Sequence, residues 1–456
     1  MTIRTGIAEE RKQIFTDIYN GIIPKRVPIS IGIGTEVYVE NAGLPVGRTA
    51  WTHEGLEEAV DEVIKDLRVD TFPGDSVRST SFSEISGSRM WKMGSDGFMQ
   101  HPESVFIEPD EYDKIKIAPW DYVLEILIPT ICENMGEDPV TRALILHTAL
   151  VARGNDIGAF GRVAGKLSAK YGLFSPPMNQ QAFCLHPLDF LASRGRGFTG
   201  ISKDMHRYPE KVFAAAESFL PLFVINALPE VITPMGATTM TCHMPTFMRT
   251  KEFEKYYYPT MSKLIHATAE AGQAFSVFCE DNWDRYMDYL EDLPQGTRLQ
   301  FEYGDPQLIK DKLGKKFIIN GLYPSVLLKT GTKQECIDKA KELLDIMAPG
   351  GNYIFNFDKS PTTLSSTNLE NLKAVVDYVA DHGTYNNAGE RIWLKDKEET
   401  IHKIRHTIPK FQSKYFIDAE KYLNDCSYPI KELEPIIAKI IEKNNINTIK
   451  AVLRMM

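Results

Sequence analysis

The chain has 456 residues, of which 43% are hydrophobic and 25% charged, and this is the composition of an ordinary soluble globular protein. Its net charge of −9 argues against nucleic acid or an anionic membrane surface as the main partner. The sequence has no apolar signal core and no run near the roughly 18 apolar residues that a membrane span needs. Its six cysteines are scattered and form no CxxC pair. We therefore expect reduced thiols and a cytoplasmic protein.

The first part of the chain has a less regular pattern than the rest. It opens with a charge-rich amphipathic stretch, MTIRTGIAEERKQIFTDIYNG, which predicts a helix. Two short runs rich in β-branched residues are strand candidates, VPISIGI at 27–33 and RVDTFPG at 68–74. Helical patterns are expected near 54–66, 117–134, 139–153 and 155–171.

Between Gly236 and His382, strand-like and helix-like segments alternate. The strand-like runs lie at 236–243, 274–281, 298–303, 316–321 and 352–357. This alternation predicts consecutive βαβ units with parallel pairing and right-handed crossovers. The local pattern fits both an open doubly wound sheet and a closed barrel, and the length of the chain favours the barrel.

Reactive side chains gather where these strand-like runs end. In a parallel barrel, catalytic groups come from the carboxyl ends of the strands. Acidic side chains at such a mouth are costly to bury unless they bind a metal, a proton or a hydrogen-bond donor. The candidates at the five ends are Cys242, His243, Cys279, Glu280, Asp281, Glu302, Asp305, Asn320 and Asp358.

Several of these candidates also have a purely structural alternative. Glu280 could cap the following helix or pair with Arg285. Asp305 stands directly before a proline and a helical pattern, which is the position of a helix N-cap. His243 could be a core histidine, and the two cysteines could be inert buried thiols.

A set of linked segments between about residues 65 and 380 resembles the uroporphyrinogen decarboxylase superfamily. The segments are GFTGISKDMHRYPEKV, FMRTKEFEKYYYPTM, FCEDNWDRYMDYLEDLP, GDPQLIKDKLGKKFIINGLYP, LLKTGTKQECIDKAKELLD, APGGNYIF and LENLKAVVDYV. The earlier VDTFPG and IEPDEYDKI resemble the branch of corrinoid-dependent methyltransferases, which includes the substrate-side subunits of anaerobic O-demethylases.

The resemblance implies an α/β fold, a (β/α)₈ TIM barrel with an N-terminal helical extension, over residues 1–383. The composition changes after Gly383 to the Lys- and Ile-rich helical patterns KDKEETIHKIRHTIPK and PIIAKIIEKNNINTIKAVLRMM. We interpret residues 384–456 as a C-terminal helical appendage. The resemblance also makes a homodimer plausible.

The sequence departs from the true decarboxylases at two points. Those enzymes carry an arginine-rich signature of the form RQAGRY, and the equivalent region here, IPKRVPISIGIGTEVYVE, lacks it. They also place a histidine near the last strand, where this chain has NFDKSP. A substrate with several carboxylates would then have no obvious clamp. Decarboxylation of a porphyrinogen is therefore the alternative function.

Related methyltransferases bind zinc through a His-x-Cys motif and a later cysteine. Aligning that motif with FCED puts Phe278 and Glu280 on the two ligand positions, so the thiolate motif is broken. The resemblance implies a carboxylate-rich set instead, with Glu280, His243 and Asp358 as ligands of a possible zinc ion.

The function predicted from the sequence is the transfer of a methyl group from a small methylated substrate, with a methoxylated aromatic favoured, to the Co(I) corrinoid of a partner protein. We expect Glu280 and Asp305 to be catalytic, and Glu302 and Asn320 to bind substrate. A corrinoid-docking subunit without catalysis is a further alternative. The expected partners are the corrinoid protein and the small methyl donor, with no nucleic acid and no membrane.

Overall fold

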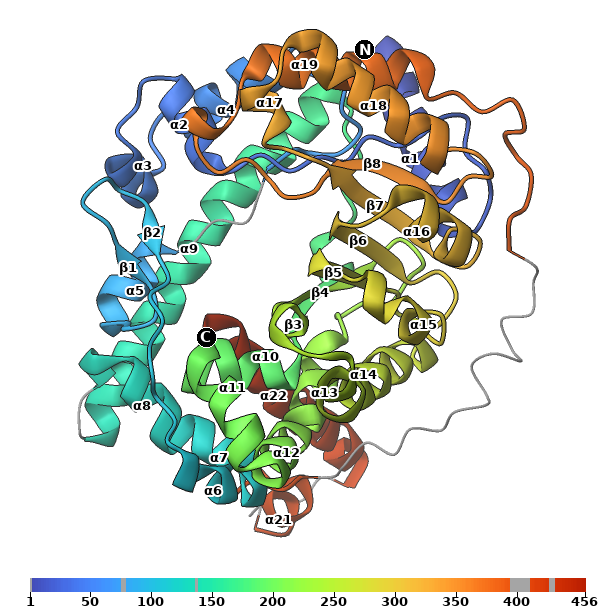
Figure 1. Ribbon diagram of the computed structural model, residues 1–456. Helices are drawn as coiled ribbons and strands as arrows, with labels where there is room; N and C mark the ends of the chain where they lie inside the picture. Colours follow the sequence, from blue (N-terminus) through green and yellow to red (C-terminus); the bar gives the residue numbers. More distant parts are fainter. Residues whose placement is uncertain (1, 75–78, 136–137, 394–410, 426–430) are drawn as a thin grey trace.

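The protein is described by a computed structural model over residues 2–74, 79–135, 138–393, 411–425 and 431–456. Six parallel strands form a sheet on the inside of a ring of helices (Figure 1). Neighbours in sequence are neighbours in the sheet: β3 (Gln181–Leu185), β4 (Ala237–Cys242), β5 (Phe275–Asn282), β6 (Arg298–Tyr303), β7 (Ile318–Tyr323) and β8 (Tyr353–Phe357). The last five are the strands predicted from the sequence, and β3 was not predicted.

The two strand candidates of the first part, 27–33 and 68–74, continue the sheet beyond β8. They form no long ladders with their neighbours, and isolated parallel bridges connect them to the sheet. These bridges join Ile29 with Phe355 of β8, Ile33 with Gly74, and Thr71 with Phe174, which lies shortly before β3. Eight segments therefore follow one another around the ring, and the predicted α/β fold of the barrel type is confirmed.

A buried ionic cluster fixes the 68–74 segment. Asp70 is fully buried, and both of its carboxylate oxygens accept hydrogen bonds from Arg26, at 2.6 and 2.7 Å. Arg11 donates to the same carboxylate at 3.2 Å, and the backbone N–H of Ile29 donates at 2.8 Å. A buried carboxylate is tolerated only with such partners, so this cluster joins the first helix to the two irregular strands.

Side chains alternate along the strands between the helices and the barrel interior. One row across the sheet is completely buried against the helices and consists of Met240, Val277, Leu299, Ile319 and Tyr353. The next row faces the interior and is partly polar, with Thr241, Phe278, Gln300, Asn320 and Ile354. Thr241 and Phe278 face the interior, so the side chains two residues further along the chain from each of them face it as well.

Helices cover the outside of the sheet between the strands. In this half they are α10 (Pro187–Leu191), α11 (Phe198–Arg207), α12 (Pro209–Ala227), α13 (Thr250–Glu252), α14 (Tyr258–Glu270), α15 (Met287–Leu290), α16 (Pro306–Leu313), α17 (Leu327–Thr330), α18 (Lys333–Met347) and α19 (Leu369–His382). The capping box predicted at Thr332 and Glu335 does open α18.

The first part of the chain adds further helices and a small hairpin of β1 (Lys92–Met93) and β2 (Met99–Gln100). The helices are α1 (Thr2–Tyr19), α2 (Thr35–Asn41), α3 (Val46–Thr52), α4 (Leu56–Ile64), α5 (Thr80–Ser86), α6 (Tyr112–Ile117), α7 (Pro119–Tyr122), α8 (Ile128–Ile131) and α9 (Pro139–Tyr171). The two helices expected near 139–153 and 155–171 are one helix, α9, because Gly154 lowers helix stability by only about 1 kcal/mol and does not break it.

The end of the chain has two parts. Residues 384–393 run beside residues 21–26, where the N–H of Tyr385 donates to the carbonyl of Lys25 at 3.0 Å. α21 (Ala419–Asn424) and α22 (Glu434–Met455) follow, and α22 packs against α12. The predicted helix at 395–410 lies outside the described residues, and the domain division at residue 383 stays a prediction.

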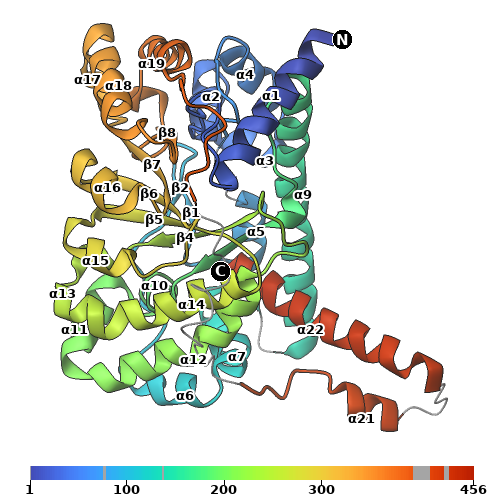
Figure 2. The ribbon, with the colours of Figure 1, turned by 90° about the vertical axis from the view of Figure 1, so that its right-hand side faces the viewer.

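Figure 2 shows two sides of the molecule. α11, α13, α15 and α17, which follow the carboxyl ends of strands, lie on one side, and α1 and α22 lie on the other. None of the described helices combines the length and the hydrophobicity that a transmembrane helix requires.

Candidate active site

The side chains of His243 and Glu280 meet at the carboxyl ends of two neighbouring strands. Cys242 of β4 and Cys279 of β5 are paired in register, so the next residue of each strand points to the same inner face. Nδ1 of His243 is hydrogen-bonded to Oε2 of Glu280. The two side chains keep 33% and 37% of their surface exposed. This is an ionisable pair that a small molecule can reach.

The charges around His243 favour its protonated form. Burial lowers the pKa of His243, but the hydrogen bond to Glu280 and the charge of Asp189 more than offset this effect. The result is a pKa above the ordinary value of a histidine. The pair can therefore hold a proton at the mouth of the barrel.

Asp189 supports the pair from the protein interior. It is fully buried in α10, where Oδ1 accepts the backbone N–H of Met244 at 2.7 Å and Oδ2 accepts the hydroxyl of Tyr257 at 2.6 Å. Burial raises the pKa of Asp189 to about 6, while the nearby His243 opposes that rise. Because Met244 directly follows His243, this carboxylate also fixes the backbone that carries the imidazole.

Glu302 lies beside Glu280 but is occupied by protein partners. Its Oε2 accepts the backbone N–H of Asp281 at 2.8 Å, and its Oε1 accepts Nζ of Lys359 at 2.7 Å. Asp281 has a φ of 62°, a left-handed conformation that Asp adopts more readily than most residues. Glu302 thus holds the irregular end of β5 in place, and its role in binding substrate stays a prediction.

The structure places Asn320 and Asp358 on the inner side of β7 and at the end of β8. Oδ1 of Asn320 accepts the side-chain amide of Asn356 at 3.3 Å. Asp358 is buried, and its Oδ1 accepts the backbone N–H groups of Ser325 at 3.0 Å and Lys359 at 2.6 Å. Both side chains are therefore held by partners within β7, β8 and the loops after them, and their roles in the site stay predictions.

Asp305 has the helix-capping position that was its structural alternative. Its exposed carboxylate accepts the backbone N–H of Gln307 at 2.9 Å at the start of α16. The proposed catalytic role of Asp305 rests on the sequence alone. Neither alternative for Glu280 is realised. The helical turns after β5 have no side-chain cap, and Arg285 donates to the carbonyl of Pro245 at 2.9 Å instead.

Aromatic side chains flank the His243–Glu280 pair. The ring of Phe198 in α11 lies 6.3 Å from the His243 ring and nearly perpendicular to it. Phe247 follows at 5.6 Å from Phe198, and 60% of its surface is exposed. The half-buried Phe198 and the exposed Phe247 together offer an apolar wall for a ring-shaped ligand.

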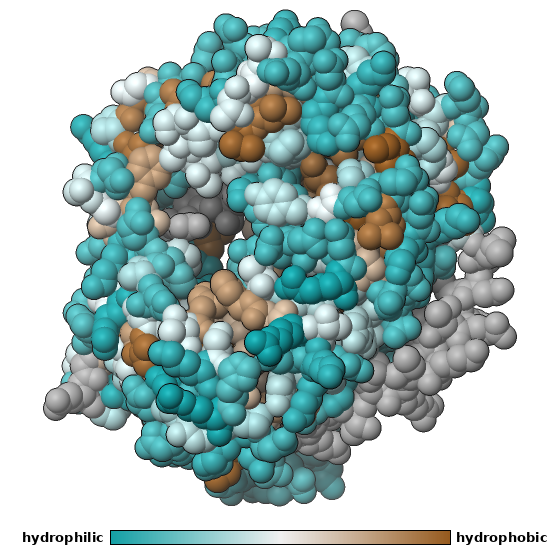
Figure 3. Space-filling model, viewed as in Figure 1, coloured by the Kyte–Doolittle hydropathy of each residue, from teal (hydrophilic) through white to brown (hydrophobic). Residues whose placement is uncertain are grey.

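The β1–β2 hairpin brings the first part of the chain to the same region. Arg194 lies 5.6 Å from the centre of the Trp91 ring and 3.1 Å from Nε2 of His101. The Trp91 and His101 rings are 4.3 Å apart. The charge of Arg194 reaches His243, where it slightly lowers the pKa of the imidazole. Figure 3 shows a hollow in the middle of the ring.

The residues proposed as zinc ligands only partly come together. His243 and Glu280 are in contact, whereas Asp358 is bonded to backbone N–H groups. Within the described parts of the chain, no three His, Cys, Asp or Glu side chains converge as a metal site. Catalytic zinc is normally held by three protein ligands. The described side chains do not fit that arrangement, and the zinc site stays a prediction from the sequence.

The two cysteines at the strand ends are shielded from solvent. Cys242 and Cys279 are fully buried, and burial raises the pKa of both thiols well above the ordinary value. A thiol that stays protonated is a poor nucleophile and a poor metal ligand. This agrees with the structural alternative that the sequence left open for them.

Sequence reasoning missed β3 and, with it, two buried residues of the site region, His186 and Asp189. His186 stacks on Tyr257 with ring centres 3.7 Å apart, and burial lowers the pKa of His186 to about 3. The available signal was the run QAFCL followed by HPLDF, a short apolar strand that ends before a proline-initiated helix. Because the run is only five residues long, its periodicity does not distinguish a strand from a helix.

Part of the chain matches a known protein family. Residues 183–382 match the family described as uroporphyrinogen decarboxylase (URO-D). The match begins inside β3 and ends with the last residue of α19, so it contains His186, Asp189, His243 and Glu280 but less than half of the chain. No curated protein matches the sequence.

Proposed function

With residues 183–382 supporting the uroporphyrinogen decarboxylase-like superfamily, whose fold is a TIM barrel, we propose that this chain is a methyltransferase. It takes a methyl group from a small methoxylated aromatic compound and gives it to the Co(I) corrinoid of a partner protein. The observation that carries this proposal is the exposed His243–Glu280 pair beside the aromatic rings of Phe198 and Phe247.

The site has the two properties that a methoxylated ring requires. Phe198 and Phe247 provide an apolar surface on which an aromatic ring can lie. His243 and Glu280 provide a polar group at one edge of that surface, where the methoxy oxygen would be placed. Pockets for small molecules generally combine apolar walls with a few polar groups that fix the orientation of the ligand.

The reaction needs a proton at the leaving oxygen. The corrinoid of the partner protein is the second substrate, and it supplies the nucleophile that accepts the methyl group. The bond between the methyl carbon and the oxygen breaks, and its electron pair stays on the oxygen as a phenolate. The proton held between His243 and Glu280 neutralises this charge and leaves a phenol as the product.

Asp189 and Glu302 act as positioning residues in this scheme. Asp189 holds the backbone next to His243 through the N–H of Met244, and its charge stabilises the imidazolium. Glu302 holds the backbone next to Glu280 through the N–H of Asp281. Preorganised acids and bases stabilise the transition state more than mobile ones do, because they need no reorganisation as charge develops.

The charges near the mouth are less suited to a porphyrinogen. A substrate with several carboxylates needs cations that are available to bind it. Lys359 is paired with Glu302, and Arg196 is paired with Asp204 at 2.7 Å. His243 is likewise paired, with the carboxylate of Glu280. Decarboxylation is therefore the less favoured alternative.

The test is an anaerobic spectrophotometric assay with Co(I) cobalamin, the purified protein and a panel of methoxyarenes, methylamines and betaines. We expect the Co(I) spectrum to convert to that of methylcobalamin with a methoxyarene. Conversion with a methylamine or a betaine alone would contradict the proposed substrate class. Release of carbon dioxide from uroporphyrinogen without a corrinoid would support the decarboxylase, and no turnover of any substrate would support a docking subunit.

A further inference from the structure

A cavity of about 170 Å³ lies at the amino ends of the strands, on the far side of the barrel from His243 and Glu280. Its walls come from the first residues of β5, β6 and β7 and from α14. Tyr19 of α1 and Trp393, near the end of the segment 384–393, complete it. The proposed methyl transfer uses none of these residues.

The cavity contains a buried cation without an anionic partner. Arg298 lines the cavity with only 8% of its surface exposed, and burial lowers the pKa of its guanidinium. Nη2 donates to the carbonyls of Pro234 and Gly236 at 3.2 and 3.0 Å, and the guanidinium lies over the ring of Tyr19. No carboxylate in the described ranges forms an ion pair with Arg298. An unpaired buried charge is costly, so an anion in the cavity would lower the free energy of the folded state.

Three polar atoms of the lining residues are buried and have no hydrogen-bond partner among the residues that the structure describes. They are Nε of Arg298, Oε1 of Gln273 and Nε1 of Trp393. Gln273 and Trp393 keep only 1% and 6% of their surface exposed. All three atoms belong to residues that line the cavity, where buried polar groups normally have a partner. Two of the three are N–H donors, one of them on the guanidinium of Arg298.

The rest of the cavity decides what kind of anion fits. Its other walls include Ile265, Ala269, Phe275 and Ile318, so most of a ligand would contact carbon atoms. A cavity of about 150 Å³ can hold a benzene-sized molecule. We propose that this cavity is a binding site for a small, mainly apolar monocarboxylic acid of about the size of benzoate, with its carboxylate at Arg298.

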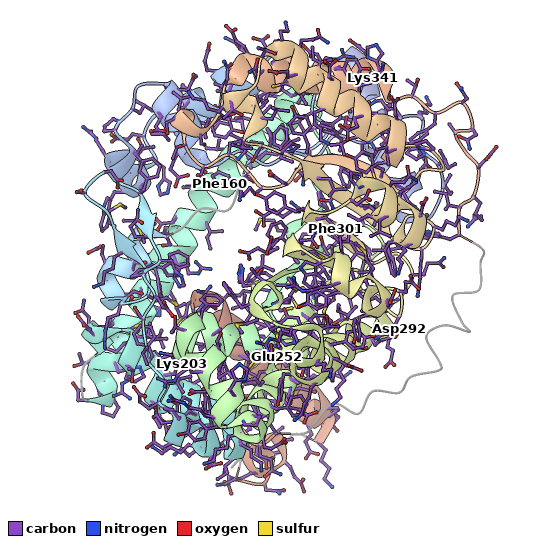
Figure 4. All side chains as sticks on the ribbon, viewed as in Figure 1. Phe160, Lys203, Glu252, Asp292, Phe301 and Lys341 are labelled. Atoms are coloured by element: carbon purple, nitrogen blue, oxygen red, sulfur yellow. The ribbon has the colours of Figure 1, made fainter. Side chains whose placement is uncertain are left out.

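Two acidic residues among the lining limit the charge of the ligand. Glu270 and Asp292 are both exposed, and Asp292 lies next to α15 on the outer side of the ring (Figure 4). Their charges would repel an anion that carries a second carboxylate or a phosphate outside the cavity. A ligand with a single carboxylate near Arg298 and an otherwise apolar body fits the apolar walls and avoids this repulsion.

The probe for this site is 4-fluorobenzoate, followed by fluorine NMR with the full-length protein. We expect line broadening and a saturable shift that gives a dissociation constant. The neutral 4-fluorobenzamide and the doubly charged 5-fluoroisophthalate should each bind at least about tenfold more weakly, because charge-assisted hydrogen bonds contribute more than 1.4 kcal/mol. Equal binding of all three compounds would overturn the role of Arg298.

Two variants locate the binding. Ala269→Leu fills the cavity from α14, and Ala267→Leu is the matched control on the same helix, because Ala267 does not line the cavity. We expect Ala269→Leu to abolish binding and Ala267→Leu to preserve it. Binding that survives Ala269→Leu would come from elsewhere, including the barrel mouth, and would overturn the proposal.

Arg298→Met tests the cation directly. Loss of 4-fluorobenzoate binding with an unchanged circular dichroism spectrum supports the proposal, and unchanged binding overturns it. If Arg298→Met does not fold, Ala269→Leu still decides the question. Methyl transfer should be unaffected by Ala269→Leu, so failure of this proposal and failure of the proposed function are separate results.

Discussion

Charged side chains at the carboxyl ends of the strands differ in burial and in pairing from those at the amino ends. At the carboxyl ends, His243 and Glu280 are paired with each other and remain partly exposed. At the amino ends, Arg298 is buried and is surrounded by carbonyl oxygens and an aromatic ring. Pairing in an open mouth costs little desolvation and keeps a proton within reach of a substrate. A buried cation without a counter-charge keeps part of its desolvation cost, which a bound anion would offset.

A second buried charge near the amino ends shows the usual solution. Asp70 is more buried than Arg298, with none of its surface exposed against 8%, but Arg11 and Arg26 surround its carboxylate. The difference separates a structural ion cluster from a candidate ligand site. The following predictions test these assignments, from the largest expected effect to the smallest, with the matched control for the first placed directly after it.

Glu280→Gln should remove the acid–base function of the mouth while keeping the shape of the side chain. We expect kcat/KM for methyl transfer to fall by about 10²–10⁴-fold, the range that general acid–base groups contribute. The melting temperature should stay nearly unchanged, because Glu280 is partly exposed. The measurement is the cobalamin assay with the best methoxyarene. A variant with full activity would refute the role of Glu280.

Asp305→Asn is the matched control at the mouth of the same barrel. Asn caps helices about as well as Asp, so a residue that only caps α16 should tolerate this change. We expect nearly unchanged methyl transfer. A loss comparable to that of Glu280→Gln would instead restore the catalytic role that the sequence suggested for Asp305.

Asp70→Asn should give the largest loss of stability. The substitution leaves Arg11 and Arg26 without their buried counter-charge. Breaking a buried ion pair from one side typically costs about 3–5 kcal/mol. The free energy of unfolding from urea titration measures this directly. A loss below about 1 kcal/mol would mean that this cluster stabilises the protein no more than a surface ion pair does.

His186→Asn tests the buried histidine that follows β3. The folded pKa of His186 is about 3, below its ordinary value of 6.5, so the unfolded chain binds more protons between these values. Stability should therefore fall as the pH is lowered from about 6.5, by about 3 kcal/mol at pH 4. Asn retains the cap on the N–H of Leu188 and has no proton to gain.

The measurement for His186→Asn is urea unfolding at both pH values. The variant should lose less stability on acidification than the wild type. Parallel losses in the two proteins would show that other groups cause the acid sensitivity, and that His186 is not the buried neutral histidine described above.

Asp381→Asn should have the smallest effect. Asp381 pairs with Arg68 at 2.6 Å, but both side chains are at least half exposed. Exposed ion pairs contribute about 0–1 kcal/mol, so the free energy of unfolding should change by no more than this. The comparison with Asp70→Asn isolates the effect of burial, since both substitutions remove a carboxylate from an arginine.

The sequence predicted the second half of the fold well because its signals are local. The runs that became β4 to β8 are short, apolar and β-branched, and capping residues such as Thr332 mark the helices between them. Their order along the chain is also their order in the sheet, so parallel pairing follows from connectivity alone. His243 and Glu280 became candidates because they stand at the ends of these predicted strands.

The sequence predicted the candidate site less well, because the site depends on contacts between residues that are distant in the sequence. That Glu280 pairs with His243 and not with Arg285 depends on the register of β4 against β5. That Asp305 caps a helix while Asp189 supports the site depends on burial, which residue type alone does not reveal. The missed β3 is a five-residue strand that is stabilised by its neighbour in the sheet.

The sequence by itself determined the α/β class, five of the strands and the set of ionisable residues at their ends, because periodicity and connectivity are properties of neighbouring residues. The tertiary structure alone decided which of those residues meet, which are buried, and that Arg298 has no anionic partner in the described part of the chain. Pairing and desolvation are set by packing between segments far apart in the sequence, and these determine the energy of a charge in a protein.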